Sequence, residues 1–276
     1  RDLVRQESER IISEKPLKDQ GCGSTGSHSA LDDETFEKIK ALRRELHKIP
    51  ELSGQERRTM EVLKTFLREH TSLSVTDRGG WFYALHQENG AEETVVFRAD
   101  MDAIKGAGNI PYHGCGHDGH SAILAGLCLL TEGRVFQKNL CFLFQPAEET
   151  GEGGNPCSRL LEELGADRVY GYHNLPGYPL GTAVMRRETF SCDTVNTPEI
   201  TDMSRMLFEQ EGIPCLEAAA PFRWSEDFGW YLKKCQGMYF GIGAGEDCPD
   251  LHTPDYEFPD EVIRNAVRCL YLLAEI

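Results

Sequence analysis

Apolar and polar residues alternate along the chain with two periods, one typical of helices and one typical of strands. Residues 36–46 carry apolar side chains at helical spacing, and Asp32 or Asp33 can cap this first helix. Further helices are predicted over residues 55–70, 121–131, 160–164, 199–210, 224–234 and 260–275, and strands over 81–86, 94–99, 139–144, 169–172 and 237–242. The first two strands flank a Glu-Asn-Gly turn. Strands that alternate with helices predict an α/β fold with a largely parallel central sheet and helices on both faces.

The pattern also predicts how the chain is divided. Residues 1–30 are expected to be an N-terminal appendage, because a charged segment there leads into a Gly/Ser-rich stretch typical of a flexible linker. Residues 31–276 are expected to form the catalytic domain, since they hold all the predicted strands and enough apolar residues for a large core.

Composition narrows the class of protein. The chain of 276 residues has 45 acidic and 29 basic residues and a net charge of −16, which argues against nucleic-acid and anionic-membrane partners. No apolar run approaches the roughly 18 residues of a membrane span. The ten cysteines show no Cys-x-x-Cys pair, so most are expected to be buried free thiols of a cytoplasmic protein.

Several potential catalytic or metal-binding residues follow the carboxyl ends of the predicted strands, where parallel sheets bind their ligands. The side chains expected there are Asp100, Asp102, Glu148, Glu149 and His173. The stretch from Tyr112 to His120 adds three histidines, a cysteine and an aspartate, with glycines that let the backbone approach an ion closely. Thiolate, imidazole and carboxylate groups together indicate a hydrolytic metal site.

Four of these side chains are the strongest candidates. Cys115 and His117 are two residues apart and can face the same metal ion or pair of ions, although Cys115 could instead be a small buried residue. Glu148 and Glu149 are adjacent, so their side chains point in different directions at a strand end. One of them can bind metal while the other faces the substrate, and the alternative is a solvated acidic loop.

Other candidates have equally ordinary explanations. His120 could orient the loop rather than bind metal, and Asp118 could cap the following helix. Asp102 could be a strand-end cap, and His173 could be a satisfied core histidine. His252 lies in a proline-containing loop, where a surface histidine is the usual interpretation.

Seven short motifs bear on this choice. They are RRELHKIPELS at 43–53, RADMDA at 98–103, CGHDGH at 115–120, QPAEE at 145–149, GYHN at 171–174, SEDF at 225–228 and LHTP at 251–254. In these motifs and their order, residues 36–276 resemble the co-catalytic metal amidohydrolases, the aminoacylase family that includes hippurate hydrolase and auxin-conjugate hydrolases. The resemblance implies a zinc-peptidase-like catalytic domain.

The resemblance also implies roles for individual residues. Two divalent metal ions would be bound by Cys115, His117, Glu149, His173 and His252. Glu148 would be the general base and acid, which activates the attacking water and then protonates the leaving nitrogen. Asp102 would orient a ligand. Zinc fits this mixed ligand set best, with Mn, Co or Ni as alternatives.

One departure from the family concerns a second domain. Family members usually carry a lid-like domain after a Ser-x-Asp-Thr segment, whereas here Thr194 is followed directly by Val195, and the loop at 104–109 is short as well. We therefore expect the lid to be deleted or unobserved at 194/195. The lid normally carries dimer contacts and a substrate-binding histidine, so a homodimer is expected only if a lid exists.

These observations predict a binuclear metal amidohydrolase that acts on small-molecule N-acyl amino acids or related small amides. Two alternatives remain open. One is a dipeptidase or other exopeptidase on the same scaffold, which would need a site for a terminal charge. The other is a metal-binding derivative without catalytic activity, which the missing lid would favour.

Overall fold

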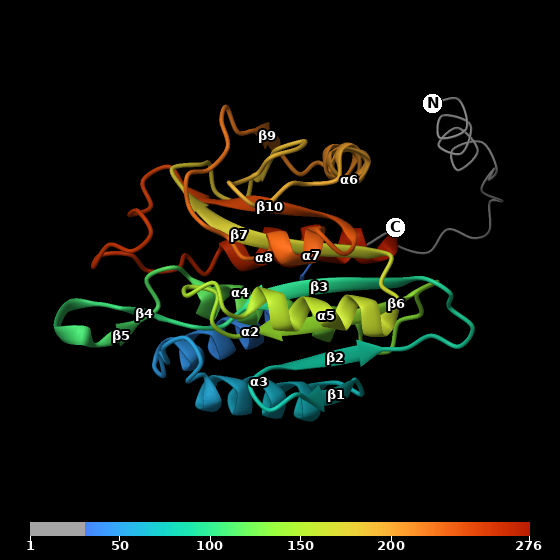
Figure 1. Cartoon of the computed structure of the whole chain (residues 1–276), viewed down its shortest axis with the longest axis horizontal. Coiled ribbons are helices and arrows are strands. Elements are labelled where there is room, and N and C mark those ends of the chain that lie inside the picture. The colour runs from blue at the N-terminus through green and yellow to red at the C-terminus, as the bar shows by residue number, and fades with distance from the viewer. Residues whose placement is uncertain (1–30) are drawn as a thin grey trace.

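Four parallel strands form the centre of an eight-stranded sheet in the computed structural model, which describes residues 31–276 (Figure 1). In spatial order they are β6 (Asn139–Gln145), β3 (Thr94–Asp100), β7 (Arg168–Pro176) and β10 (Gln236–Gly245). Every residue of β3 is buried, as expected for a parallel strand that is covered on both faces. The predicted α/β class with a largely parallel sheet is confirmed.

Shorter strands extend the sheet on both sides. β1 (Ser74–Asp77) and β2 (Phe82–His86) continue it antiparallel beyond β6, and β8 (Ala183–Met185) and β9 (Cys215–Glu217) follow β10. A separate two-stranded sheet consists of β4 (Ile104–Lys105) and β5 (Pro111–Tyr112). The two strands that flank the Glu-Asn-Gly turn, β2 and β3, are not neighbours, because β6 lies between them and pairs with both.

Helices cover both faces of the sheet. One face carries α2 (Asp33–His47), α3 (Arg57–His70), α4 (His117–Thr131), α6 (Pro198–Gln210) and α8 (Val262–Glu275), and the other carries α5 (Gly154–Leu164) and α7 (Gly229–Leu232). A short 3₁₀ helix spans Ala107–Asn109. Alternate residues of β3 supply the two cores, since Val95 and Phe97 pack with the first set and Val96 packs with the second. Figure 1 shows α5 in front of the sheet with α2 and α4 behind it.

Local signals explain several helix ends. Asp32 caps α2, because its carboxylate accepts the Thr35 N–H at 2.7 Å. The helix expected at 121–131 begins earlier, at His117, after the left-handed Gly116. The expected helix at 224–234 was wrong over most of its length, since only Gly229–Leu232 is helical. The backbone before it instead turns Glu226 and Asp227 toward the buried Arg98.

The position predicted for a missing lid lies in a tight turn between β8 and α6. Phe190 N–H donates to the Thr194 carbonyl at 2.9 Å, and Thr189 pairs with Val195 in an isolated bridge. Within residues 31–276 the connection at 194/195 is thus a hydrogen-bonded turn, and the loss of a lid at this point stays a prediction. The predicted appendage, residues 1–30, lies outside the described residues. None of the helices of the described part is both long and apolar enough to cross a membrane.

Candidate metal centre

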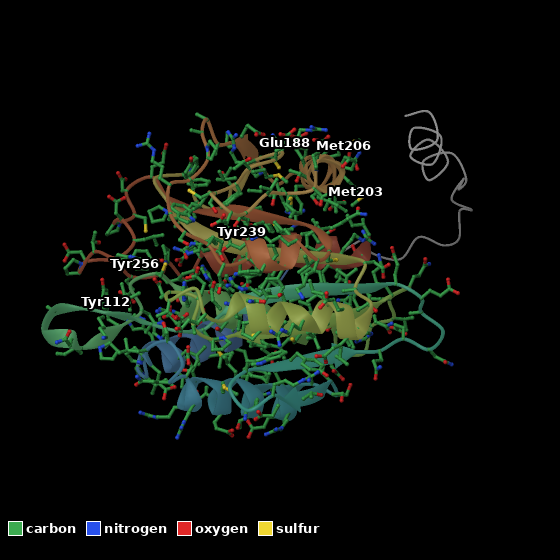
Figure 2. All side chains as sticks on the ribbon, in the orientation of Figure 1. Tyr112, Glu188, Met203, Met206, Tyr239 and Tyr256 are labelled. Carbon is green, nitrogen blue, oxygen red and sulfur yellow. The ribbon has the colours of Figure 1, made fainter. Side chains whose placement is uncertain are left out.

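The candidate ligands meet where the central strands end. Asp100 ends β3, and Glu148 and Glu149 follow β6 after a short turn. The sequence predicted a strand that ends before His173. In the structure β7 continues to Pro176, so His173 lies within the strand. His117 is the first residue of α4, so the Cys-Gly-His motif joins a loop to a helix start. Figure 2 labels Tyr112 at this end of the molecule.

Cys115 is the common member of two groups of potential ligands. Its Sγ lies 3.4 Å from His173 Nε2 and 3.2 Å from His252 Nε2. The first group consists of Cys115, His117 and His173, and the second of Cys115, Glu149 and His252; in each, the ligand atoms lie within 4.8 Å of one another. All five side chains that the sequence predicted as ligands are therefore brought together. A sulfur atom shared by two groups suits a pair of ions, which are typically separated by roughly 3.5–4 Å.

Two polar atoms at this centre have no hydrogen-bond partner among the described residues, so both are free to bind a metal ion. His117 Nε2 and Glu149 Oε1 are buried without a hydrogen-bond partner among the described residues. They are 3.7 Å apart, and Glu149 Oε1 is also 3.5 Å from His252 Nε2. Buried polar atoms without partners are unfavourable. The donor set of thiol, imidazole and carboxylate therefore fits divalent cations of the zinc type.

The protonation behaviour of the ligands agrees with this fit. Burial raises the pKa of the Cys115 thiol well above its ordinary value, so a nearby cation would be needed to hold it as a thiolate. Burial and the neighbouring His120 keep the pKa of His173 well below its usual range, which favours the neutral imidazole that binds metals. Burial opposes ionisation of Glu149, yet the His252 and His117 rings lower the pKa of this carboxyl below its usual value.

Glu148 forms a further candidate ligand group with His117 and Glu149, in which the ligand atoms lie within 4.8 Å of one another. Its Oε2 lies 3.9 Å from His117 Nε2, and its carboxylate also approaches those of Glu226 and Asp227. Burial raises the pKa of Glu148 well above the ordinary range, and the Glu226 carboxylate adds to the rise. A carboxyl group with a raised pKa at the edge of a ligand cluster is suited to accept a proton and to return it.

Asp102 connects three parts of the centre. Its Oδ1 lies 3.1 Å from His117 Nδ1, and its Oδ2 accepts the Ser53 hydroxyl at 2.7 Å and the Glu149 N–H at 3.0 Å. A carboxylate on one ring nitrogen directs the other nitrogen of the histidine toward a metal. The contacts of Asp102 thus suit the orienting role that the resemblance implied.

The two undecided residues of the motif are engaged elsewhere. His120 Nδ1 lies 2.7 Å from Asp100 Oδ1, and its Nε2 lies 2.6 Å from Asn174 Oδ1. Both ring nitrogens of His120 thus contact protein atoms, which suits an orienting role, and His120 also forms a candidate ligand group with Asp100 and His117. Asp118 Oδ2 lies 2.7 Å from His47 Nδ1 and 3.5 Å from an Arg43 nitrogen, away from both ligand groups.

Sequence reasoning missed a buried cluster around Arg98. This side chain is 1% exposed, and it donates to Gln145 Oε1 at 2.8 Å, Asp100 Oδ2 at 2.6 Å and Asp227 Oδ1 at 2.7 Å. Glu226 lies 3.5 Å away. The cluster fixes the ends of β3 and β6 against the SEDF motif. The motifs that contain these residues were visible in the sequence, but the contacts between them were not.

Backbone strain marks two positions at the centre. Ala147, directly before Glu148, has φ 53°, and His252 has φ 62°, in the left-handed region that non-glycine residues rarely adopt. His252 N–H donates to the Gly114 carbonyl at 2.8 Å, which ties this loop to the Cys115 loop. Ala147 N–H donates to the Glu56 carboxylate at 2.8 Å. Such strain persists where surrounding contacts fix it, and it is common at functional sites.

The fold and the ligand groups are those of a metal-dependent hydrolase, and the comparisons identify the family. The sequence model of Peptidase family M20/M25/M40 matches residues 96–276, and the chain belongs to this family. It is similar to N-acetyldiaminopimelate deacetylase of Geobacillus thermodenitrificans, with 31% identity over 175 residues, 58% of this chain and 46% of the relative. With the same enzyme of Lactobacillus helveticus the identity is 30% over 206 residues, 67% and 54% of the two chains.

Solved structures show the same fold. A Bacillus subtilis protein described as a dinuclear metal binding peptidase of the M20 family aligns with TM-score 0.80 and 18% identity, over 88% of this chain and 98% of that one. The LapA aminopeptidase of Legionella pneumophila aligns with TM-score 0.64 and 14% identity, over 99% and 82% of the two chains. The chain spans about half the length of the curated relatives that it matches.

Proposed function

We propose that this chain is a binuclear metal-dependent hydrolase that cleaves the amide bond of N-acyl amino acids or related small amides. The observation that carries the proposal is the pair of ligand groups that share Cys115. One ion would be held by Cys115, His117 and His173, and the other by Cys115, Glu149 and His252. Zinc suits the mixed donors best, and Mn, Co or Ni remain alternatives.

The chain's own residues account for the proton transfers. Bound divalent ions would supply Lewis acidity for the amide carbonyl. Glu148, whose Oε2 lies 3.9 Å from His117 Nε2, would take a proton from the attacking water and deliver it to the leaving nitrogen. Asp102 would keep His117 Nε2 directed at the centre through its contact with Nδ1.

The substrate class is inferred from the relatives and from the exposure of the centre. The deacetylase relatives act, by their names, on an N-acetylated diamino acid, which supports an N-acyl amino acid as the substrate. The side chain of His252 is 53% exposed, whereas that of His117 is fully buried, so a small molecule would enter on the His252 side. The free cysteines of the described residues support a reducing, cytoplasmic setting.

A comparison of two substrate types tests the proposal. The purified chain, loaded with zinc, manganese or cobalt, would be given N-acetyl amino acids and unblocked dipeptides, and released amine would be measured. We expect release from the N-acetyl amino acids, and its disappearance in Glu148→Gln. Release from dipeptides alone would establish the exopeptidase alternative. Retained metal without release from either type would establish the non-catalytic alternative.

A further inference from the structure

The strained turn before Glu148 is held by a residue outside the ligand groups. We propose that Glu56 is a positioning residue, whose buried carboxylate keeps Ala147 in its left-handed conformation and thereby aims Glu148 and Glu149. This inference rests on the proposed function for its chemical meaning. Its structural part concerns only the turn at 146–153 and can be tested without metal.

The turn is fixed on both sides of the Ala147 peptide unit. Ala147 N–H donates to Glu56 Oε1 at 2.8 Å, and the Ala147 carbonyl accepts the N–H groups of Glu152 and Gly153, each at 3.1 Å. An alanine at φ 53° is strained because its Cβ crowds the following carbonyl oxygen. Such a conformation persists only where surrounding contacts hold it, and the Glu56 carboxylate supplies the contact to the Ala147 N–H.

The position of Glu56 on its own helix supports this role. Glu56 stands at the N-cap of α3, where a side chain commonly accepts hydrogen bonds from the first turn of the helix. Its side chain makes no such bond and reaches across to Ala147 instead. It is 3% exposed, so the carboxylate is also largely withdrawn from solvent. The Glu56 carboxylate thus makes no hydrogen bond to the first turn of its own helix and accepts one from the neighbouring turn.

The residues just before α3 also contact the turn at a second point, through Asp102. Ser53 donates to Asp102 Oδ2 at 2.7 Å, and the same oxygen accepts the Glu149 N–H at 3.0 Å. Leu52 also pairs with Ala103 in a parallel bridge. The residues that precede α3 therefore hold the turn at two points, at Ala147 directly and at Glu149 through Asp102. Glu148 lies between these points, so its backbone is held on both sides.

A cobalt titration of the metal-free chain provides the first test. Thiolate-to-cobalt absorption reports ions bound by Cys115, and each equivalent is followed separately. In Glu56→Ala we expect the equivalent that involves Glu149 to weaken by about 10- to 100-fold, a typical effect of losing an outer partner of a ligand. The equivalent held by His117 and His173 should change far less. Glu56→Gln should bind close to wild type, because its amide oxygen can still accept the Ala147 N–H.

A control and a rescue separate positioning from general destabilisation. Glu51 precedes the same helix, and its carboxylate accepts the Thr59 N–H at 2.9 Å and hydroxyl at 3.0 Å. Glu51→Ala removes two hydrogen bonds but should leave both cobalt equivalents intact. Ala147→Gly adopts positive φ without strain, so adding it to Glu56→Ala should recover much of the binding, and the folding if the single variant is unstable. A double variant as defective as Glu56→Ala would overturn the inference.

Amide hydrogen exchange keeps this inference distinguishable from the proposed function. Without metal, the segment 146–153 should exchange faster in Glu56→Ala than in wild type, Glu56→Gln or Glu51→Ala. If the wild-type chain bound no metal at all, the proposed function would be wrong. The exchange rates of segment 146–153 would still show whether Glu56 holds the turn. Unchanged exchange in this segment, or unchanged cobalt binding in Glu56→Ala, would overturn the positioning role.

Discussion

His252 Nε2 lies 3.2 Å from Cys115 Sγ, although 137 residues separate the two in the sequence. The loop that carries His252 is tied to the Cys115 loop by a backbone hydrogen bond to Gly114. Neither residue belongs to a strand, so their proximity depends on the packing of two loops at one end of the sheet. The contact places the sulfur between the His252 and His173 rings, which is the geometric basis of a shared ligand.

Cys115→Ser should weaken binding of both metal ions, because the sulfur belongs to both ligand groups. The loss should exceed about 100-fold, the upper end of what removing an outer partner costs. Metal titration of the dialysed protein measures it. Cys192→Ser, at an exposed cysteine, is the control and should bind as wild type. Equal binding by Cys115→Ser and wild type would show that the thiol is only a buried small residue.

The two adjacent glutamates should separate chemistry from metal binding. Glu148→Gln preserves shape and removes the proton acceptor, so metal content should persist while turnover falls by about 10²- to 10⁴-fold. Glu149→Gln should lose metal affinity instead, because Glu149, unlike Glu148, shares a ligand group with Cys115 and His252. Metal analysis and acyl-amino-acid hydrolysis on both variants decide the matter. If Glu148→Gln lost metal and Glu149→Gln kept it, the two roles would be reversed.

Much of the fold followed from residue periodicity, because the central strands are long buried runs with helices between them. β8 and β9 were missed since three-residue strands carry too little pattern to be recognised. The helix expected at 224–234 was wrong because its polar residues serve the buried Arg98 rather than a solvent-facing helix side. Local pattern cannot reveal such long-range pairing.

The sequence nominated the candidate ligands of the site but not the residues that hold those ligands in position. The five ligand candidates are chemically conspicuous and stand near strand ends or in a distinctive loop, so the sequence and its family resemblance nominated them together. Glu56 gave no such signal, because a glutamate at the start of an amphipathic helix is usually exposed. Its importance depends on the left-handed conformation of Ala147, which nothing in the residue type Ala predicts.

Arg98→Met should strongly destabilise the fold. Arg98 is the cation of a buried cluster with Asp100, Glu226 and Asp227, and removing one partner of a buried charge set typically costs about 3–5 kcal/mol. Urea unfolding measures the change in free energy. Arg187→Met is the matched control, because its pair with Asp202 is exposed to solvent and should contribute little to stability. Similar losses in both variants would contradict the proposed importance of the cluster.

His47 should make the metal-free fold less stable as pH rises above about 6.5, the ordinary histidine pKa. The hydrogen bond with Asp118 raises the pKa of His47 above its ordinary value of about 6.5, although burial and Arg43 oppose the rise; Glu257 contributes to it. His113 also stands near, with the two ring centroids 6.1 Å apart. Because the folded-state pKa is raised, the stabilisation is fully present below about pH 6.5 and is lost as pH rises through the folded-state value.

Unfolding measured between pH 5.5 and 8.5, roughly one to two units on either side of an ordinary histidine pKa, tests this. His47→Asn should flatten the decline in unfolding free energy with pH. His70→Asn, at an exposed histidine of α3, should leave the decline unchanged. An identical pH profile in His47→Asn and wild type would exclude the effect.

The most direct test of the binuclear centre is anomalous X-ray scattering from crystals of the zinc-loaded chain. We predict two peaks roughly 3.5–4 Å apart, both about 2.3 Å from Cys115 Sγ. One should also contact His117 and His173, and the other Glu149 and His252. A single peak, or peaks that leave the sulfur of Cys115 unbound, would contradict the account.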